Sequence, residues 1–348
     1  MQVKDDIVVG GDFEIAIPQY KNEVLPIEFQ EGYYYSSGRA ALYAIIQHIE
    51  ETRKDIKTIL IPDYICHSVI ETIQKTHLAI EVYHLTRTFL VPEEVVSRGN
   101  LDDKAILLVN YFGLMSLEKD IQRLRIYNKY VCIIEDNVQS LLSMFEPSSA
   151  DYRFTSFRKA LPVPDGGWVK TKYAMLQPEK INRFAQYKIA GGILKGLRHY
   201  QCFDDSLYLK MLETGEEKID ENLDKSISQF TLDTLANQNL VRFKTLRVRN
   251  AEYLVKHLAE IGITPMISYS EGCVPLFIPI CLRNRNIVRN ALFAKQIFCP
   301  VHWPIPNEGY AEYTMAMKMQ EVELSLIVDQ RYNTQIMQEI INTIKEYL

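Results

Sequence analysis

Short apolar runs alternate with amphipathic stretches from residue 33 to residue 172. The runs are TILIP (58–62), AIEVYHL (79–85), AILLVNYF (105–112), VCIIED (131–136) and GWVKT (167–171). Several are nearly continuous in Val, Ile and Leu, which is typical of strands buried on both faces of a sheet. Helix-like patterns between them cover Arg39–Glu51, Ser68–Lys75 and Glu118–Asn128. Strands and helices alternating at this spacing predict βαβ units and a mostly parallel sheet.

The pattern is less regular over residues 173–222. This stretch contains four glycines, two of them adjacent, and many aromatic and basic residues. We therefore expect irregular helices and loops that wrap the first domain. A long amphipathic pattern then runs from Lys225 to Ile261 and predicts one helix, with Gly262 as its C-cap.

The last part of the chain reads as a smaller α+β domain. It contains a strand-like piece, CVPLFIPICL (273–282), a helix near Asn286–Lys295 and a final helix from Asp329 to Leu348. We expect two domains in all, residues 1–224 and residues 225–348, because a chain of 348 residues exceeds what one hydrophobic core usually serves.

Composition narrows the class of protein. Apolar residues make up 47% and charged residues 24% of the chain, an ordinary globular balance, and the net charge of -5 provides no basic surface for nucleic acid or anionic lipid. Six cysteines without CxxC spacing favour neither a metal site nor a disulfide framework. An acidic N-terminal stretch and the lack of a long apolar run predict a cytoplasmic protein without signal peptide or membrane span.

The first motif with possible chemistry is SSGRAALYAII (36–46). A turn that contains Ser37 and Gly38 leads directly into a helix. Free backbone N–H groups and the positive end of the helix dipole make such a start suitable for a phosphate group. The alternative is an ordinary N-cap serine, and the motif taken alone favours that reading.

The second motif is VCIIEDNVQS (131–140), in which an apolar strand ends in Glu135 and Asp136. Ligands of open α/β sheets bind beyond the carboxyl ends of the strands. A carboxylate in that place can keep a heterocyclic ring nitrogen protonated. The alternative is a surface pair of acids that opens the next helix. Gln139 lies one helical step beyond Asp136 and can face the same pocket.

The third motif is TSFRKALPVPDGGWV (155–169). Lys159 follows a short strand-like run and precedes a proline-rich turn that closes on Gly166 and Gly167. Burial or a neighbouring cation lowers the pKa of a lysine and frees its amine to form a Schiff base. The alternative is a solvated surface lysine, the usual role of a lysine in a loop.

Together these motifs resemble those of the DegT/DnrJ/EryC1/StrS family, fold-type-I enzymes that use pyridoxal 5'-phosphate (PLP) and are best known for aminating keto-sugar nucleotides. KALPVPDGG has the family's spacing from Lys159 to the glycine pair, with Asp165 in place of a glutamate. IPDYICHSVIETI (61–73), VNYFG (109–113), PVHWP (300–304) and LSLIVDQRY (324–332) follow in matching order, so the resemblance covers nearly the whole chain.

The resemblance implies a role for each motif residue. Lys159 would anchor the cofactor and Asp136 would pair with its ring nitrogen, and these two are the expected catalytic residues. The expected cofactor-binding residues are Ser37, Gly38, Arg39 and Ser156 at the phosphate, Gln139 at the ring hydroxyl, and Cys66 and His67 at the ring face. His302, in CPVHWPIP, would lie near the substrate, the alternative being a structural histidine. No metal is expected.

The chain departs from the family pattern at three places. Two residues separate Ser156 from Lys159, where the family usually has four. The family's ring-stacking aromatic residue falls near Cys66, so His67 or Tyr64 would have to replace it. The family's asparagine that enters the neighbouring subunit's phosphate site has only a weak counterpart, Asn222.

The resemblance implies an aspartate-aminotransferase-like fold, with a large seven-stranded α/β domain and a small C-terminal α+β domain. The implied function is amino transfer from glutamate to a keto-sugar, nucleotide-linked, in cell-surface polysaccharide or amino-sugar biosynthesis, by a homodimer. Two alternatives stay open. One is a PLP enzyme of another reaction type or with a non-sugar substrate; the family's sugar dehydratases replace the lysine with histidine, so Lys159 counts against that version. The other is a non-catalytic binding protein on the same fold.

Overall fold

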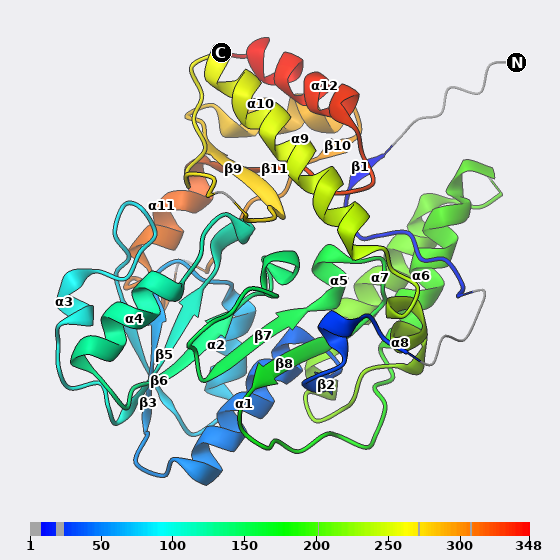
Figure 1. The fold of residues 1–348 in the computed structure, drawn as a ribbon. Coiled ribbons are helices and arrows are strands. Elements are labelled where there is room, and N and C mark those ends of the chain that lie inside the picture. The colour runs from blue at the N-terminus through cyan, green and yellow to red at the C-terminus, as the bar shows by residue number, and fades with distance from the viewer. Residues whose placement is uncertain (1–7, 19–23, 201, 271, 307) are drawn as a thin grey trace, which may run out of the picture. The chain divides into compact units, whose positions relative to one another are not determined.

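The computed structural model describes the chain except for residues 1–7, 19–23, 201, 271 and 307 (Figure 1). The chain divides into two compact units. The first contains Asp12–Lys54 and Asp151–Asn239, and the second contains Asp55–Ala150 and Leu240–Leu348 with the N-terminal stretch that ends at Gly11. Each unit is discontinuous in sequence, whereas the sequence analysis expected a single boundary after residue 224.

One seven-stranded sheet has the strand order β2-β8-β7-β6-β5-β3-β4. Its strands are β2 (Tyr33–Tyr35), β3 (Thr58–Pro62), β4 (Ala79–Tyr83), β5 (Lys104–Val109), β6 (Cys132–Asp136), β7 (Tyr152–Ser156) and β8 (Gly167–Thr171). β3 pairs in parallel with β4 and β5, β5 pairs in parallel with β6, and β8 pairs antiparallel with β2 and β7. The expected α/β class with a mostly parallel sheet is confirmed.

Strands β3, β5 and β6 of the second unit are buried almost throughout, whereas the edge strand β4 is mostly half-buried or exposed. Every residue of β6 is buried, and in β5 only Lys104 is partly exposed. The helices between these strands are α2 (His67–Gln74), α3 (Glu93–Val96) and α4 (Glu118–Tyr127), joined by short 3-10 turns at Tyr111–Gly113 and Leu141–Ser143. Strands buried on both faces need continuous apolar runs, which is why the sequence pattern located them within a few residues.

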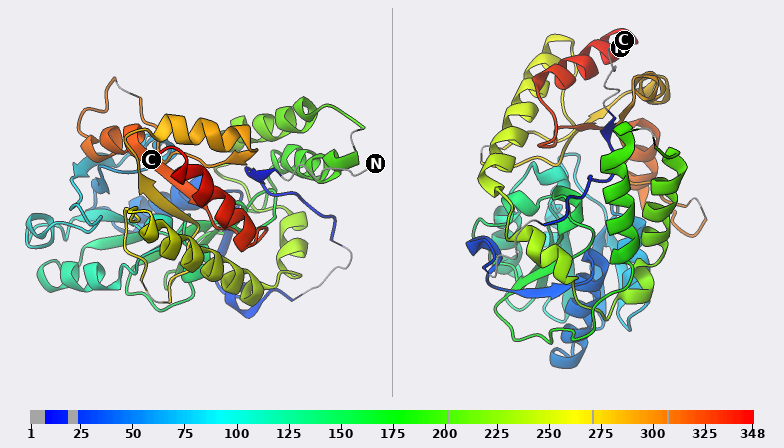
Figure 2. Two further views of the ribbon diagram at one scale, coloured as in Figure 1. Left: turned by 90° about the horizontal axis from the view of Figure 1, so that it is seen from above. Right: turned by 90° about the vertical axis from the view of Figure 1, so that its right-hand side faces the viewer.

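In the first unit, helix α1 (Gly38–Thr52) packs against β7 and β8. The remaining helices of this unit are α5 (Phe157–Ala160), α6 (Ala185–Leu197), α7 (Asp205–Glu217) and α8 (Gln229–Leu235), with 3-10 turns at Ile27–Phe29, Arg198–Tyr200 and Ile219–Asn222. Figure 2 shows α6 and α7 side by side as a helical hairpin.

The expectation of irregular structure over residues 173–222 is wrong, because α6 and α7 are regular helices of 13 residues each. Glycine weakens an isolated helix, but it also lets two helices approach closely. A Cβ added to Gly191 would lie 2.8 Å from a side-chain atom of Leu212, and one added to Gly215 would lie 2.8 Å from Lys188. Tertiary packing of the hairpin therefore outweighs the low helix propensity of its glycines.

The single helix expected from Lys225 to Ile261 is also wrong. Helix α8 ends at Leu235, and α9 (Leu240–Glu260) begins five residues later. In the break, Asn237 and Gln238 donate side-chain hydrogen bonds to the backbone oxygens of Asp233 and Thr234. Such short-range bonds compete with continued helix, so a polar run interrupts an otherwise amphipathic pattern.

The C-terminal part of the second unit contains two small sheets. β9 (Phe277–Cys281) pairs antiparallel with β11 (Glu323–Ile327), and β1 (Val9–Gly10) pairs in parallel with β10 (Ile297–Phe298). Helices α9, α10 (Arg285–Ala294), α11 (Thr314–Val322) and α12 (Thr334–Lys345) complete it. Gly262 adopts a positive φ of 78° after α9, as expected of a C-cap.

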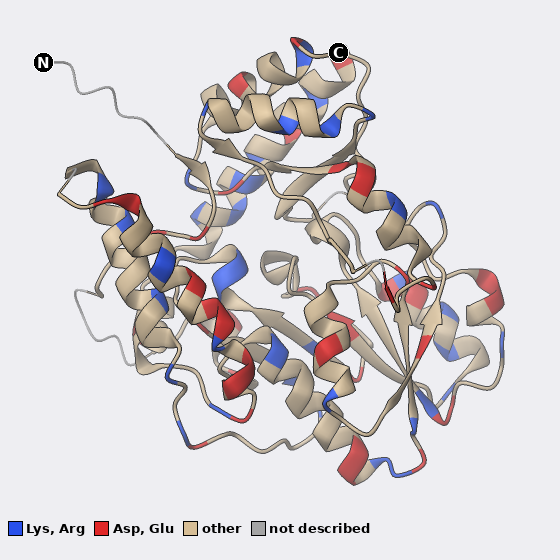
Figure 3. Ribbon diagram, turned by 180° about the vertical axis from the view of Figure 1, so that it is seen from behind, with Lys and Arg blue, Asp and Glu red and all other residues tan. Residues whose placement is uncertain are grey.

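The distribution of charged residues agrees with the composition of the chain. Acidic and basic residues are interspersed along the ribbon (Figure 3). Within the described part of the chain, no helix combines the length and the apolar character that crossing a membrane requires.

Candidate functional site

The parallel strands of the second unit end in polar residues. Asp63 follows β3, His84 follows β4, Asn110 follows β5, and Asp136 is the last residue of β6. Asp63 accepts hydrogen bonds from the backbone of Leu85 and from His84, 3.0 Å away in each case, so its carboxylate holds neighbouring loops together. Asn110 and Asp136 belong to neighbouring strands, and the backbone N–H of Asn110 donates to the carbonyl of Asp136 at 3.0 Å.

Asp136 is a buried acid, not part of a surface pair. Its side chain is 6% exposed, and Oδ1 accepts the backbone N–H of Val138 at 2.8 Å. Burial, together with the nearby charge of Glu135, raises the pKa of Asp136 to about 7, although the Val138 N–H works in the opposite direction. A cation beside this carboxyl would recover the ionised form that burial disfavours.

Gln139 supports the loop after β5. Its Oε1 accepts the backbone N–H of Phe112 at 3.0 Å. Phe112 lies in the left-handed region, with φ of 57°, and the following Gly113 has φ of 70°. The amide of Gln139 therefore holds a backbone conformation that large side chains rarely adopt.

Asn110 is a candidate that the sequence analysis did not single out. It is 4% exposed, and its Oδ1 is buried without a hydrogen-bond partner among the described residues. A buried acceptor of this kind is suited to a donor group of a ligand. The signal was present in the run AILLVNYF, where a polar residue follows five buried strand positions.

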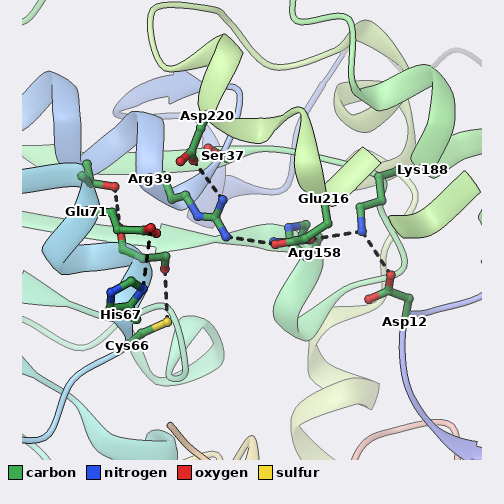
Figure 4. A network of polar contacts seen from close by, with 12 residues as sticks. Asp12, Ser37, Arg39, Cys66, His67, Glu71, Arg158, Lys188, Glu216 and Asp220 are labelled. Carbon is green, nitrogen blue, oxygen red and sulfur yellow. Dashed lines mark hydrogen bonds and ion pairs between the residues drawn. The ribbon is translucent and has the colours of Figure 1, made fainter. Parts of the chain in front are cut away.

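Cys66 and His67 begin α2. The sulfur of Cys66 lies 3.1 Å from the hydroxyl oxygen of Ser68, and Nε2 of His67 lies 2.7 Å from the hydroxyl of Tyr310. Nδ1 of His67 lies 3.7 Å from Oε1 of Glu71 (Figure 4). The rings of His67 and Tyr310 meet edge to face at 5.1 Å. The other suggested stacking group, Tyr64, is fully buried against Tyr111, with the ring centroids 5.5 Å apart.

His302 is held at both its backbone and its ring. Its N–H donates to Glu323 at 2.6 Å, its carbonyl accepts the hydroxyl of Tyr64 at 2.6 Å, and its Nδ1 lies 2.7 Å from the hydroxyl oxygen of Ser325. The ring of Phe112 meets the imidazole edge to face at 5.5 Å. The side chain is partly exposed, so a fixed ring reaches the surface of the second unit.

In the first unit, Ser37 and Gly38 form a tight helix start. Ser37 is the N-cap of α1 and accepts the backbone N–H of Ala40 at 3.1 Å, so the capping alternative for this serine is present in the structure. Gly167 packs directly on this start, because a Cβ there would lie 2.0 Å from the carbonyl oxygen of Ser37. Gly166, with φ of 103°, donates its N–H to the carbonyl of Ser36 at 2.7 Å. The glycine pair thus fixes the backbone of the expected phosphate-binding turn.

The aspartate before the glycine pair has a structural role. Asp165 is fully buried and accepts hydrogen bonds from the backbone and hydroxyl of Ser228, the hydroxyl of Thr231 and the amide of Asn182. Burial raises its pKa although all of these bonds oppose the rise. Asp165 therefore connects the glycine turn to the N-terminus of α8.

Arg39 forms ion pairs with carboxylates of its own unit. Its guanidinium lies 2.9 Å from Asp220 and 3.1 Å from Glu216 (Figure 4). Burial would raise the pKa of Glu216, but four neighbouring cations outweigh it and hold that pKa well below its usual range. These cations are Arg158, Lys159, Lys188 and Arg39. Sequence reasoning missed Glu216, which lies 177 residues from Arg39.

Lys159 lies on the four-residue helix α5 and is exposed, whereas its helix neighbours Phe157 and Ala160 are buried. Its charge acts on Glu216 and on Asp12, so the amine belongs to the same charged cluster as Arg39. Ser156, which closes β7, is buried and pairs in register with Gly167. The first unit therefore brings together Ser37, Gly38 and Ser156 through β7, β8 and α1.

Asn222 is engaged within its own unit. Its side chain donates to the carbonyl of Lys218 at 2.8 Å and accepts the N–H of Arg183 at 3.2 Å, while its carbonyl accepts the hydroxyl of Ser36 at 2.6 Å. These bonds hold the 3-10 turn Ile219–Asn222 against the start of α1.

Two observations fit a bound PLP. In the second unit, a buried acid at a strand end matches a protonated ring nitrogen, and the oxygen of Asn110, which has no partner in the described part of the chain, matches a donor group. In the first unit, the start of the 15-residue helix α1 offers N–H groups to a phosphate, and a lysine follows β7. The residues present are thus suited to this cofactor.

No protein-family model and no curated protein sequence matches this chain. Solved structures do. A DegT/DnrJ/EryC1/StrS aminotransferase from Brucella abortus is 14% identical, with 92% of this chain and 87% of that one covered and a TM-score of 0.65. The chain has the fold of PLP-dependent fold-type-I aminotransferases.

Two further neighbours extend the comparison. A Streptococcus pneumoniae protein described as a sugar aminotransferase, solved in its PMP form, is 15% identical, with 92% and 86% coverage and a TM-score of 0.65. A GDP-4-keto-6-deoxymannose-3-dehydratase with bound GDP-perosamine is 16% identical, with 89% and 87% coverage and a TM-score of 0.62. At such identities the likeness shows the fold alone, and that fold serves more than one reaction.

Proposed function

We propose that this protein is a PLP-dependent aminotransferase. The observation that carries the proposal is Asp136, a carboxyl that lies buried at the end of a parallel strand and whose pKa burial raises to about 7. An acid buried without a counter-charge is costly and is retained where a ligand or a reaction uses it. PLP, when bound, supplies a protonated ring that stabilises negative charge on a substrate carbon.

The roles proposed for the individual residues follow from their chemistry. Asp136 would keep the ring nitrogen protonated, and Asn110 and Gln139 would lie at its ring hydroxyl. Ser37, Gly38, Arg39 and Ser156 would bind the phosphate, and Cys66 or His67 would line the ring. Lys159 would hold the cofactor through its amine and then move a proton to and from the substrate carbon.

The proposed substrates are glutamate as amino donor and a keto-sugar, nucleotide-linked, as acceptor, with His302 near the acceptor. Support comes from the motif order and from the Streptococcus pneumoniae neighbour described as a sugar aminotransferase. We also propose a homodimer, to be checked by sedimentation or light scattering, in the synthesis of cell-surface polysaccharide or amino sugars. A non-sugar ketone would be the simplest competing acceptor.

The test is a half-reaction followed by mapping of the anchor lysine. The protein loaded with PLP should show a visible absorbance band that glutamate converts to the pyridoxamine form. Borohydride reduction and peptide mapping should place the cofactor on Lys159. Lys159→Ala should abolish the band while changing stability little, because the side chain is exposed.

Lys172→Ala is the matched control, since Lys172 is another exposed lysine of the first unit, with a side chain 70% exposed. It should keep the band and the half-reaction. A cofactor adduct on a lysine other than Lys159 would contradict the proposed anchor. PLP binding with no response to glutamate or other amino donors would favour another reaction type, and no PLP binding would favour the non-catalytic alternative.

A further inference from the structure

A chain of hydrogen bonds in the second unit joins a buried carboxyl to His302. Glu323 and Ser325 lie two residues apart on β11, so their side chains share one face of the strand, and both residues are fully buried. Ser325 donates its hydroxyl to Oε1 of Glu323, and the hydroxyl oxygen lies 2.7 Å from Nδ1 of His302. The other carboxyl oxygen, Oε2, accepts the backbone N–H of His302 at 2.6 Å.

Ser325 gives this chain of hydrogen bonds a direction. A hydroxyl group has one proton, so Ser325 can donate to Glu323 or to His302 but not to both at once. If Ser325 donates to the carboxylate, its oxygen must accept a proton held on Nδ1 of His302. If Glu323 is protonated and donates to the serine, the hydroxyl proton turns toward Nδ1, and a neutral imidazole then holds its proton on Nε2.

We propose that Glu323, acting through Ser325, is a positioning residue that decides which ring nitrogen of His302 holds the proton. With Glu323 ionised, His302 has the Nδ1–H form and its Nε2 is an acceptor. With Glu323 protonated, His302 has the Nε2–H form and its Nε2 is a donor. The change takes up one proton from solvent at the carboxyl, while the imidazole exchanges one proton between its two nitrogens and stays neutral.

The surroundings of Glu323 place this change near neutral pH. Burial raises the pKa of Glu323 to about 7, against the opposing effects of the bonds from Ser325 and His302 and of the charge of Arg285. The groups that face Glu323 from neighbouring elements are Arg285 of α10, Cys281 of β9, Cys299 after β10, and Tyr64 after β3.

Of these groups, only the arginine is charged near pH 7. Burial raises the pKa of Cys281, raises that of Cys299 to about 12, and raises that of Tyr64 well above its ordinary value. The charges of Lys318 and Arg289 act on Cys281 and Cys299 respectively. Among Glu323 and these four neighbouring side chains, Glu323 is therefore the one whose charge changes in the neutral range.

The consequence for substrate rests on the proposed function, in which His302 lies near the keto-sugar. An acceptor at Nε2 suits a sugar hydroxyl, whereas a donor at Nε2 suits a carbonyl oxygen. The proton position on His302 would then influence which of these groups is held. The exchange between the two imidazole forms itself is a property of the second unit and does not require cofactor or substrate.

The experiment is a pH titration of the full-length protein with ¹⁵N-labelled histidine, in which long-range ¹H–¹⁵N spectra show which ring nitrogen is protonated. His302→Gln identifies the resonances of His302 among those of the seven histidines. We expect the Nε2–H form below about pH 7 and the Nδ1–H form above it, in line with the pKa of Glu323. A single form throughout, or an imidazolium with both nitrogens protonated in place of the Nε2–H form, would overturn the proposal.

Two variants and a control complete the test. In Glu323→Gln the amide donates to Ser325 at every pH, so His302 should stay in the Nε2–H form and the transition should be lost. Ser325→Ala removes the link and should uncouple His302 from Glu323. Glu321→Gln, an exposed position two residues earlier, should leave the transition unchanged. A wild-type transition in Glu323→Gln would also overturn the proposal, whereas a normal transition in a protein without amino-transfer activity would overturn only the proposed function.

Discussion

Gly167→Ala is the substitution that tests most directly how the glycine pair builds the expected phosphate-binding turn. The added Cβ would lie 2.0 Å from the carbonyl oxygen of Ser37, 2.4 Å from its carbonyl carbon and 3.0 Å from the backbone nitrogen of Gly38. Real Cβ atoms essentially never come closer than 3.0 Å, and all three atoms are backbone, so no side chain can rotate away. Either β8 or the start of α1 must move by about 1 Å.

The energetic cost follows from that geometry. Inserting a methyl group into a well-packed core typically costs ~1–3 kcal/mol, and a contact made by backbone alone belongs at the upper end of that range. We therefore expect Gly167→Ala to lower the free energy of unfolding by about 3 kcal/mol. The same displacement opens the N–H groups of Ser37 and Gly38, so PLP should bind more weakly, whereas pyridoxal, which has no phosphate, should lose little affinity.

Urea unfolding followed by circular dichroism measures the first effect, and titration with PLP and with pyridoxal measures the second. The matched control is Gly196→Ala in α6, where the nearest atom to an added Cβ is 3.9 Å away. That change should be neutral or stabilising by ~0.4–1 kcal/mol. An unfolding midpoint of Gly167→Ala equal to that of the wild type would refute the packing argument. An equal loss of affinity for PLP and pyridoxal would refute the assignment of the phosphate to this turn.

Three further outcomes are expected. Asp136→Asn should make the cofactor-free protein more stable than wild type above about pH 7, because the raised pKa of Asp136 means that ionising the buried acid destabilises the fold. The same substitution should remove most amino-transfer activity. Equal urea midpoints of the two proteins at pH 8 would contradict the stability prediction. Because the pKa of Glu216 is lower in the folded than in the unfolded chain, ionised Glu216 stabilises the fold, and this contribution is lost as the pH falls below about 4.3. The unfolding midpoint of Glu216→Gln should therefore change less with acidification than that of the wild type. Asp165→Ala should destabilise the first unit by ~2–4 kcal/mol, since it leaves the buried hydroxyls of Ser228 and Thr231 and the amide of Asn182 without their acceptor. A decrease in the free energy of unfolding below about 1 kcal/mol would show that water replaces the carboxylate.

Strands β3, β5 and β6 could be predicted because burial on both faces requires nearly continuous apolar sequence. β7 was indicated only as a short strand-like run before Lys159, because its sequence YRFTS contains Arg, Thr and Ser, all of which are nevertheless buried. The hairpin of α6 and α7 was missed for a related reason. The role of a glycine in close helix packing depends on which residue faces it, and local propensity does not contain that information.

The candidate site divides in the same way. The positions of Asp136 at a strand end and of Ser37 at a helix start could be predicted, because the local pattern places them there. The contacts of Asp165, Glu216 and Glu323 could not be predicted, since each has partners between 17 and 177 residues away that only the folded chain brings near. Arg39 shows the limit most plainly: its position was predicted, but its pairing with two carboxylates of α7 and the following turn was not.

The antiparallel pairing of β2 with β8 has a consequence for how the protein is made. Tyr33–Tyr35 aligns with Gly167–Val169, so the strand partner of β2 is synthesised more than a hundred residues after it. Until β8 has been synthesised, the edge strand of three tyrosines and the apolar face of α1 lack the residues that they pack against in the folded protein. The part of the first unit that is synthesised first is therefore among the last to reach its native contacts. We expect the nascent chain to be most exposed to aggregation, and most in need of a chaperone, before β8 has been synthesised.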